Sequence, residues 1–330
     1  MSLDIDTRKV VAASLREVFA RRAAAGEADA RSLSAALDDL GWDEVAAAEP
    51  ADATTMLFTE QGRSLTCSRL LDQVLLAELT ELLPPPDGPR AVLYPVSGAT
   101  GLPGQPRDGV LLGGLDAIAQ VVTPSADGVW LLVLPAAALA TTPVRGFDSG
   151  TTWLAAAPDP ALATATVPAG DGWCRALAAG RRAAAAEIIG VCQGALDIAV
   201  AHTSAREQYG RPLASFQAVR HQLAESHAAI ESARVTLAAA WAAAADPSRV
   251  ADPGWAAALA KQRAGHAQAL VTSRTVQVLG AMGLTLENDM HRHVTRAAAL
   301  DLLLGGHAEL GETLGAALLA GADPLPVADI

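Results

Sequence analysis

The C-terminal half of the sequence is a succession of long helical patterns that glycine and proline interrupt, and this pattern constrains the fold most. Apolar residues recur at spacings of three and four through residues 215–246, as on one face of an α-helix. Gly210 predicts the end of the preceding helix. Asp252 followed by Pro253 predicts an N-cap with proline at the first helical position. Together these signals predict an up-and-down helical bundle over residues 173–330.

The expected helix boundaries in this half follow from the same helix-ending and helix-starting residues. Ser215 is the expected N-cap of the second long helix. The predicted helices span residues 173–209, 215–246, 253–279 and 287–303, with a short last helix ending near residue 320.

The first 172 residues divide into two regions of different character. Residues 1–88 are predicted to form a helical domain, with helices near residues 32–40, 54–61 and 68–83. Residues 89–172 hold short apolar runs separated by turn residues, and they predict a small antiparallel β-domain. Asp108-Gly109 and Asp127-Gly128 are its expected hairpin turns. The predicted fold class is therefore mainly α with a small β-domain, in the order helices, strands, helical bundle.

Composition excludes several classes of function. Apolar residues make up 51% of the chain with only 4% aromatic residues, and the abundant alanine favours closely packed helices. The net charge of −12, without a basic run, argues against nucleic-acid binding. Cys67, Cys174 and Cys192 predict neither disulfides nor a zinc site, and no metal site is expected. Without a signal peptide or a charge-free membrane span, the chain is expected to be soluble and cytoplasmic.

Two motifs in the C-terminal half resemble acyl-CoA dehydrogenases. Residues 206–219 read REQYGRPLASFQAV, similar to the family's R-x-x-F-G-x-P followed by x-F-Q. Residues 277–287 read QVLGAMGLTLE, similar to Q-x-x-G-G-x-G-F-T-x-E. Leu40-Gly41-Trp42 and residues 60–63 are further landmarks. The resemblance implies the family's three-domain fold and α,β-desaturation of an acyl-CoA thioester with FAD.

The resemblance also implies which residues meet the cofactor. In the family, an arginine at the position of Arg206 reaches the pyrophosphate of the FAD that a neighbouring subunit mainly binds, and the guanidinium fork suits phosphate oxygens. Gln277 and Gly280 correspond to residues that meet the same FAD, and Ala281 stands where the family has a second glycine. The residues implied to line the adenine end are Gln208, Tyr209, Leu213 and Phe216.

The chain departs from the family at the positions of chemistry. The family's catalytic carboxylate occupies one of two positions, and counting along the motifs places Gly180 and Gly305 there. Glycine cannot accept a proton, so no catalytic residue is expected. The Thr-Glu and Ser-Asp pairs of the family's β-domain are absent from residues 93–100, and His307 replaces a threonine. The predicted β-domain, residues 89–172, is also shorter than is usual in the family.

The retained and lost residues imply a division of labour. The chain is expected to be the non-catalytic subunit that clamps the FAD of a homologous catalytic partner, which would bind the acyl-CoA. Some actinobacterial acyl-CoA dehydrogenases of steroid side-chain breakdown are such heterotetramers, with two subunits of each kind.

Two alternatives remain open from the sequence. The chain could be a homomeric dehydrogenase with a relocated base, for which Glu187, Glu287 and Glu309 are the candidates. It could also be a flavin-free scaffold that uses the bundle for assembly only.

Overall fold

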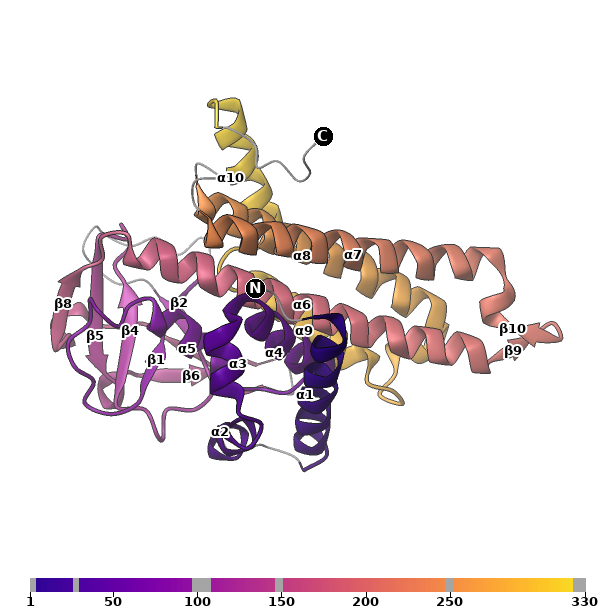
Figure 1. Cartoon of the computed structure of the whole chain (residues 1–330), viewed down its shortest axis with the longest axis horizontal. Helices are drawn as coiled ribbons and strands as arrows, with labels where there is room; N and C mark the ends of the chain where they lie inside the picture. The colour runs from indigo at the N-terminus through magenta and orange to yellow at the C-terminus, as the bar shows by residue number, and fades with distance from the viewer. Residues whose placement is uncertain (1–3, 26–29, 97–107, 146–150, 247–251, 323–330) are drawn as a thin grey trace. The chain divides into compact units, whose positions relative to one another are not determined.

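The computed structural model describes residues 4–25, 30–96, 108–145, 151–246 and 252–322 (Figure 1). Contacts divide the chain into two compact units. The bundle unit comprises residues 1–67, 182–301 and 307–330, and the strand unit comprises residues 68–181 and 302–306. The three-domain division at residues 1–88, 89–172 and 173–330 stays a prediction.

The N-terminal part of the bundle unit is helical, as expected. Its helices are α1 (Ile5–Ala25), α2 (Ala30–Asp38), α3 (Trp42–Ala48) and α4 (Pro50–Ser64). Arg16 of α1 donates two hydrogen bonds to the buried carboxylate of Glu60 on α4, at 2.7 and 3.0 Å. This two-pronged, charge-assisted pair fixes α1 against α4.

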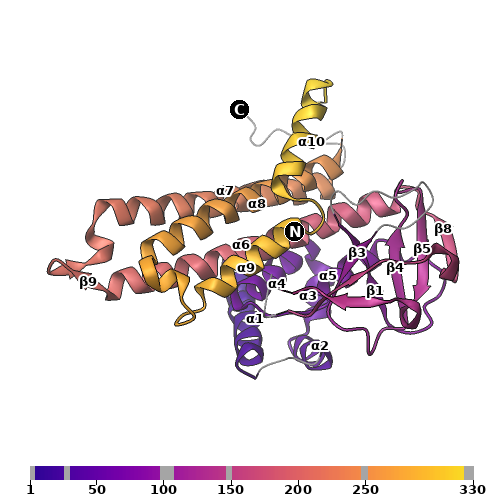
Figure 2. The ribbon, with the colours of Figure 1, turned by 180° about the vertical axis from the view of Figure 1, so that it is seen from behind.

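The long helices of the bundle unit follow the sequence expectation closely. They are α6 (Gly172–Ala205, of which residues 182–205 belong to this unit), α7 (Gln217–Ala245), α8 (Pro253–Leu279), α9 (Met290–Leu302) and α10 (His307–Leu319). Helices α7 and α8 lie side by side (Figures 1 and 2). The predicted N-cap of α8 is confirmed, because Asp252 accepts a hydrogen bond from the backbone N–H of Gly254 at 2.8 Å.

The predicted N-cap of α7 is wrong. Ser215 ends the 3₁₀ helix η3 (Leu213–Ser215), and α7 begins two residues later at Gln217. The N–H of Phe216 bonds the carbonyl of Leu213 at 3.0 Å, so a tight turn takes the place of a side-chain cap.

Helices α4 and α6 pack at very short range. A Cβ atom added at Gly190 of α6 would overlap the backbone carbonyl oxygen of Thr59, and one added at Gly62 of α4 would overlap that of Glu187. Only glycine lets the two backbones approach this closely. Alanines at 183–186, all buried, continue the narrow face of α6.

The strand unit holds α5 (Leu70–Ala77) and two four-stranded sheets, in the orders β1-β4-β5-β8 and β2-β3-β7-β6. The strands are β1 (Arg90–Val92), β2 (Tyr94–Pro95), β3 (Gly109–Leu112), β4 (Gln120–Pro124), β5 (Trp130–Pro135), β6 (Thr141–Pro143), β7 (Trp153–Ala156) and β8 (Ala165–Pro168). The small β-domain is therefore confirmed.

Two details of the predicted β-domain are wrong. Strand β1 pairs with β4 in parallel, whereas the other described pairs within the two sheets are antiparallel. Because β1 and β4 are far apart in sequence, no hairpin fixes their relative direction. Asp127-Gly128 does lie in the β4–β5 hairpin, but Gly109 starts β3 and pairs with Pro95.

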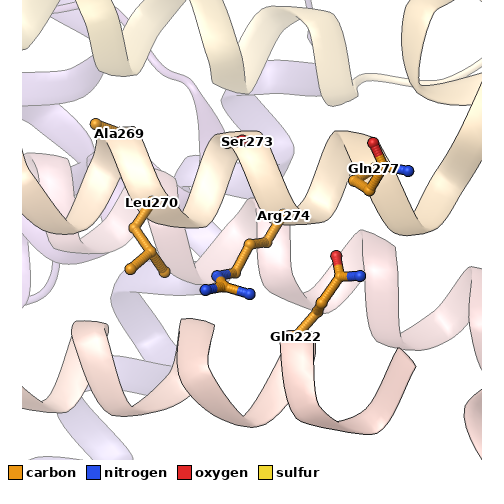
Figure 3. Close-up of a pocket in the computed structure, with 6 residues that line it drawn as sticks. All are labelled: Gln222, Ala269, Leu270, Ser273, Arg274 and Gln277. Carbon is orange, nitrogen blue, oxygen red and sulfur yellow. The ribbon is translucent and has the colours of Figure 1, made fainter. Parts of the chain in front are cut away.

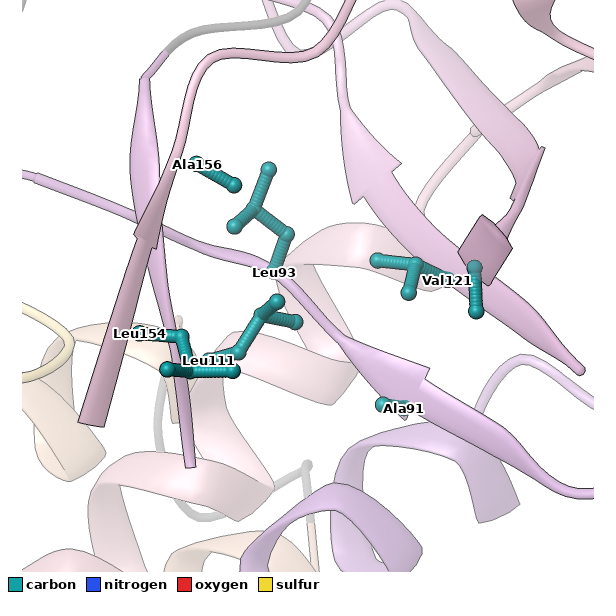
Figure 4. Close-up of a cluster of buried hydrophobic side chains, with 7 residues drawn as sticks. Ala91, Leu93, Leu111, Val121, Leu154 and Ala156 are labelled. Atoms are coloured by element: carbon teal, nitrogen blue, oxygen red, sulfur yellow. The ribbon is translucent and has the colours of Figure 1, made fainter. Parts of the chain in front are cut away.

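The core of the strand unit lies between strands of its two sheets. Figure 4 shows buried side chains from β1, β3, β4 and β7 converging, together with Leu93. The buried cluster comprises Ala91, Leu93, Leu111, Val121, Ala136, Leu154 and Ala156. Helix α5 ends at Ala77, earlier than the predicted residue 83, although Leu79 and Leu83 beyond its end are still buried.

Helix α6 is long and apolar enough to cross a membrane by length and composition alone. However, 78% of its most apolar window is buried within the fold. This burial is typical of the central helix of a packed bundle, which is apolar on all sides.

Candidate cofactor site

Arg206 stands at the junction between α6 and a short hairpin. Its N–H still bonds the carbonyl of His202 at 2.9 Å, and its own carbonyl accepts from the N–H of Leu213 at 2.8 Å. Between these bonds the chain forms β9 (Glu207–Gln208) and β10 (Arg211–Pro212), which pair antiparallel. The exposed guanidinium therefore projects from the C-terminal end of a helix, where the macrodipole favours a cation.

The hairpin presents an aromatic surface to solvent. Tyr209 at its tip is 94% exposed, and its ring meets that of Phe216 edge to face at a centroid distance of 6.3 Å. The guanidinium of Arg211 lies 4.1 Å from the centre of the Phe216 ring on the ring face. Tyr209, Arg211 and the partly exposed Phe216 thus form an aromatic and cationic surface close to Arg206 in the chain.

Gln277 and Gly280 lie at the C-terminal end of α8. The N–H of Gly280 caps the helix on the carbonyl of Gln277, and Gly280 adopts φ 62° and ψ −137°, a conformation that favours glycine. No atom would lie within 4 Å of an added Cβ there, so the backbone is open to approach by a ligand. Ala281 follows in the 3₁₀ helix η5 (Gly280–Leu284) and is exposed.

One buried cluster carries both groups of predicted residues at the same end of the bundle unit. It is formed by Ala195 and Ala199 of α6, Val278 and Leu279 of α8, and Met290 of α9, with Val219 and Leu223 of α7 packed against it. The hairpin continues from α6 into α7, and Gln277 directly precedes the cluster residue Val278. The structure thus brings Tyr209 and Phe216 into contact and anchors Gln277 nearby in the fold, whereas no described contact joins Arg206 to Gln277.

Sequence reasoning missed two residues beside Gln277. Arg274 and Gln222 line a pocket with it, between α8 and α7. The sequence did hold a signal for Arg274, because Arg274 and Gln277 are three residues apart and residues at this spacing share one face of a helix. For Gln222 the signal was absent, because only the pairing of α7 with α8 brings it there.

Both predicted positions for the catalytic base, Gly180 and Gly305, lie in the strand unit. Gly180 lies in α6, and a Cβ atom added there would be 2.6 Å from Cδ1 of Leu75 and 2.9 Å from Cδ1 of Leu304. A side chain at this position would therefore require the methyl groups of Leu75 and Leu304 to shift. Gly305 adopts φ 104°, a conformation in which a residue with a side chain is strained.

The candidates for a relocated base are scattered. Glu187 is buried within α6, whereas Glu287 and Glu309 are exposed. Glu287 precedes the start of α9 at Met290, so the expectation that it opens a helix is wrong. Glu309 lies in the first turn of α10, where a carboxylate favours the helix dipole.

Tyr94 occupies the segment in which the family's Thr-Glu pair is missing. It is fully buried, and its hydroxyl donates to Asp72 at 2.8 Å while Arg69 donates to the other oxygen at 3.0 Å. Burial raises the pKa of Asp72 to about 6, against the opposing effect of Arg69. These side chains satisfy one another inside the strand unit, whereas Ser97–Thr100 of the same segment lie outside the described residues.

A histidine–aspartate pair joins α9 to α10. Nδ1 of His307 lies 2.6 Å from Oδ2 of Asp301, and the fully buried Lys261 of α8 donates to the Asp301 carbonyl at 2.8 Å. An added Cβ at Gly265 would overlap the same carboxylate, so α8 packs directly against it. His307 therefore belongs to a structural cluster in the bundle unit.

Comparison with known proteins shows which protein family the chain resembles. Residues 170–319 match the acyl-CoA dehydrogenase C-terminal domain. Residues 170–319 therefore carry an acyl-CoA dehydrogenase C-terminal domain. Acyl-CoA dehydrogenase IpdE2 of Mycolicibacterium smegmatis is 39% identical over 121 residues, which are 37% of this chain and 36% of that protein.

Solved structures share the fold over nearly the whole chain. The Tcur3481-Tcur3483 steroid ACAD G363A variant matches with a TM-score of 0.78 at 24% identity, covering 96% of this chain and 98% of that one. The ChsE4-ChsE5 complex from Mycobacterium tuberculosis matches with a TM-score of 0.76 at 19% identity, covering 98% and 100%. By contrast, the chain spans only about a third or less of the length of the curated relatives it matches first.

Proposed function

We propose that this chain is the non-catalytic subunit of an FAD-dependent acyl-CoA dehydrogenase and that it clamps the FAD of a homologous catalytic subunit. The observation that carries the proposal is the structure around Gly180 and Gly305, the two positions predicted for the catalytic base. Leu75 and Leu304 fill the space beside Gly180, and the backbone at Gly305 disfavours any side chain. Desaturation needs a base for the α-proton of the thioester, so the partner would have to supply it.

The residues within the two motifs that resemble the family fit a partner's cofactor. Bound FAD would supply the hydride acceptor. Arg206 would pair with its pyrophosphate, the rings of Tyr209 and Phe216 with Gln208 and Leu213 would border the adenine, and Gln277 with Gly280 and Ala281 would approach from α8. In this chain's own strand unit, the segment that lacks the family's Thr-Glu pair holds the buried Tyr94, whose hydroxyl donates to Asp72.

Exposed apolar side chains next to these residues favour assembly. Leu284 and Leu286 follow Ala281 and are 81% and 83% exposed. Large apolar side chains at such exposure are typical of surfaces that a partner covers. Two of the solved chains with this fold come from complexes named for two proteins, ChsE4-ChsE5 and Tcur3481-Tcur3483. We propose a heterotetramer with two copies of each subunit, acting in the cytoplasm on a steroid-type acyl-CoA bound by the partner.

Flavin content tests the shared site. The chain should purify without FAD, and with a homologous catalytic dehydrogenase it should form a complex that holds a flavin for each pair of subunits. In that complex, Arg206→Ala should weaken FAD binding about tenfold or more, because a charge-assisted bond to phosphate is lost. Absorbance of the bound flavin after dialysis measures this, and Arg220→Ala, which removes another exposed arginine nearby on α7, should leave it unchanged.

The other outcomes select the alternatives. A flavin on every chain of the protein purified alone would contradict the proposal and point to a homomeric dehydrogenase with a relocated base. A stable complex without any flavin would point to a scaffold.

Restoring a glutamate should not restore a catalytic site. In Gly180→Glu, the new side chain has to displace two leucines, and overpacking of this kind costs about 1–3 kcal/mol of stability. The complex should keep its turnover of acyl-CoA for each bound flavin while the variant chain unfolds at lower denaturant. Gly315→Glu is the matched control, since no atom lies within 4 Å of its added Cβ. Dehydrogenase activity of Gly180→Glu purified alone with FAD would show that the chain holds FAD without a partner, which contradicts the shared site.

A further inference from the structure

Two histidines lie beside each other where α8 and α10 pack together in the bundle unit. His266 is an exposed residue of α8, and His307 is the first residue of α10. Their ring centres are 6.4 Å apart, and the ring planes meet at 70°. The helices approach closely at this point, because a Cβ atom added at Gly265 would lie 2.7 Å from Cβ of His307. Two imidazoles from separate helices therefore face the same part of the α8–α10 contact.

The hydrogen bond from His307 to Asp301 leaves one ring nitrogen for a further ligand. Nδ1 of His307 lies 2.6 Å from Oδ2 of Asp301. A carboxylate accepts and does not donate, so Nδ1 carries the proton and Nε2 of the neutral ring keeps its lone pair. The side chain of His307 is 30% exposed, whereas that of Asp301 is only 9% exposed. An imidazole bound through one nitrogen to a carboxylate is the usual arrangement of a histidine that ligates a metal ion.

Asp301 is itself held in place by α8 and α10. The fully buried Lys261 of α8 donates to the Asp301 carbonyl at 2.8 Å and lies 3.7 Å from its carboxylate. The backbone N–H of His307 donates to the same carboxylate at 3.2 Å. These contacts fix the carboxylate, and the carboxylate in turn fixes the orientation of the His307 ring. Asp301 also offsets the positive charge of Lys261, which would otherwise repel a cation. Both are positioning residues.

We propose that His266 and His307 together bind one divalent transition-metal ion such as Zn²⁺, and that the ion fastens α10 to α8. Neutral imidazole is a common ligand of zinc, copper and nickel. With Zn–N distances of about 2.0–2.1 Å in a tetrahedral site, two ring centres lie roughly 5 Å apart. The two rings therefore approach each other by about 1 Å on binding, which the exposed side chain of His266 achieves by rotation. Water completes the coordination.

The pocket beside Gln277 on the same helix offers no comparable set of ligands. Its polar lining consists of the amides of Gln222 and Gln277, the hydroxyl of Ser273 and the guanidinium of Arg274 (Figure 3). A guanidinium repels a cation, and zinc prefers imidazole, thiolate and carboxylate ligands. Zinc should therefore bind at the histidine pair. The proposal does not rest on the proposed function, because neither histidine is assigned a role toward FAD.

Titration of the full chain with zinc chloride by calorimetry tests the site. Zn²⁺ should bind the wild type, and His266→Ala should weaken binding about tenfold or more, since even the loss of an outer-shell partner typically costs that much. This variant should fold, because His266 is exposed. His227→Ala is the matched control, since it removes an exposed histidine of α7, and it should bind zinc like the wild type. Mg²⁺ should not bind, because it prefers oxygen ligands.

Hydrogen exchange locates the ion within the fold. Zinc should slow exchange at the start of α10 in the wild type and leave His266→Ala unchanged, because the ion joins α10 to α8. The inference is overturned by equal zinc affinity of the wild type and His266→Ala, by no zinc binding to the wild type at millimolar concentration, or by bound zinc that leaves exchange at α10 unchanged. The flavin content of the complex is measured separately, so these results leave the proposed shared FAD site untouched.

Discussion

Replacing Gly190 with alanine is expected to destabilise the bundle unit by ~3 kcal/mol or more, since its Cβ would overlap a backbone oxygen and not a movable side chain. The oxygen belongs to Thr59, whose hydroxyl also donates to the carbonyl of Ala186 on α6 at 3.5 Å. Relief would require α4 to move away from α6 along their whole contact. Denaturant unfolding followed by circular dichroism measures the effect.

The control for this variant is Gly315→Ala on α10. No atom lies within 4 Å of the added Cβ, and Gly315 does not have a positive φ. Alanine there should be neutral or stabilising by up to ~1 kcal/mol, from helix propensity alone. If Gly190→Ala and Gly315→Ala unfold at the same denaturant concentration, the short approach of α4 to α6 is wrong.

Replacing Asp301 with alanine should have an effect of similar size. Its carboxylate lies 3.7 Å from the ammonium of the fully buried Lys261 and accepts from both the N–H and Nδ1 of His307. Removing one partner of a buried ion pair typically costs about 3–5 kcal/mol, because the remaining charge keeps its desolvation penalty. The loss should appear in the unfolding free energy and in earlier hydrogen exchange at the start of α10.

An exposed ion pair is the natural comparison. Glu231 pairs with Arg234 on α7 with both side chains well exposed, so Glu231→Ala should cost below ~1 kcal/mol. The double variant Asp301→Asn with Lys261→Met should recover part of the Asp301→Ala loss, because it removes the buried charge as well. Equal losses for Asp301→Ala and Glu231→Ala would show that the buried cluster contributes no more than a surface pair.

The candidate cofactor site shows which residues a local sequence motif can identify and which it cannot. The residues around Arg206 and Gln277 were predictable because each belongs to a run whose local pattern resembles the family. Their roles toward FAD stay predictions. That both runs end on one cluster around Leu279 and Met290 is a tertiary fact. So is the pocket beside Gln277, since Gln222 and Arg274 come from helices whose pairing no local pattern encodes.

At the two predicted positions for the catalytic base, sequence and tertiary structure also decide different things. The sequence alone has glycines at 180 and 305, the two positions predicted for the family's catalytic carboxylate. What surrounds Gly180 depends on packing, since the side chains of Leu75 and Leu304 reach it from two other segments of the strand unit. The positive φ of Gly305 likewise belongs to the path of the loop.

By itself, the sequence determined the order of helices and strands, most helix boundaries and the likeness of residues 170–319 to acyl-CoA dehydrogenases. These follow from periodicity, from caps such as Asp252 and from contiguous motifs, all of which act over a few residues. Only the tertiary structure decided the parallel pairing of β1 with β4, the close approach at Gly190, the buried Lys261–Asp301 pair and the α7–α8 pocket. Each of these depends on contacts between segments distant in the chain, where loop closure and packing override local preference.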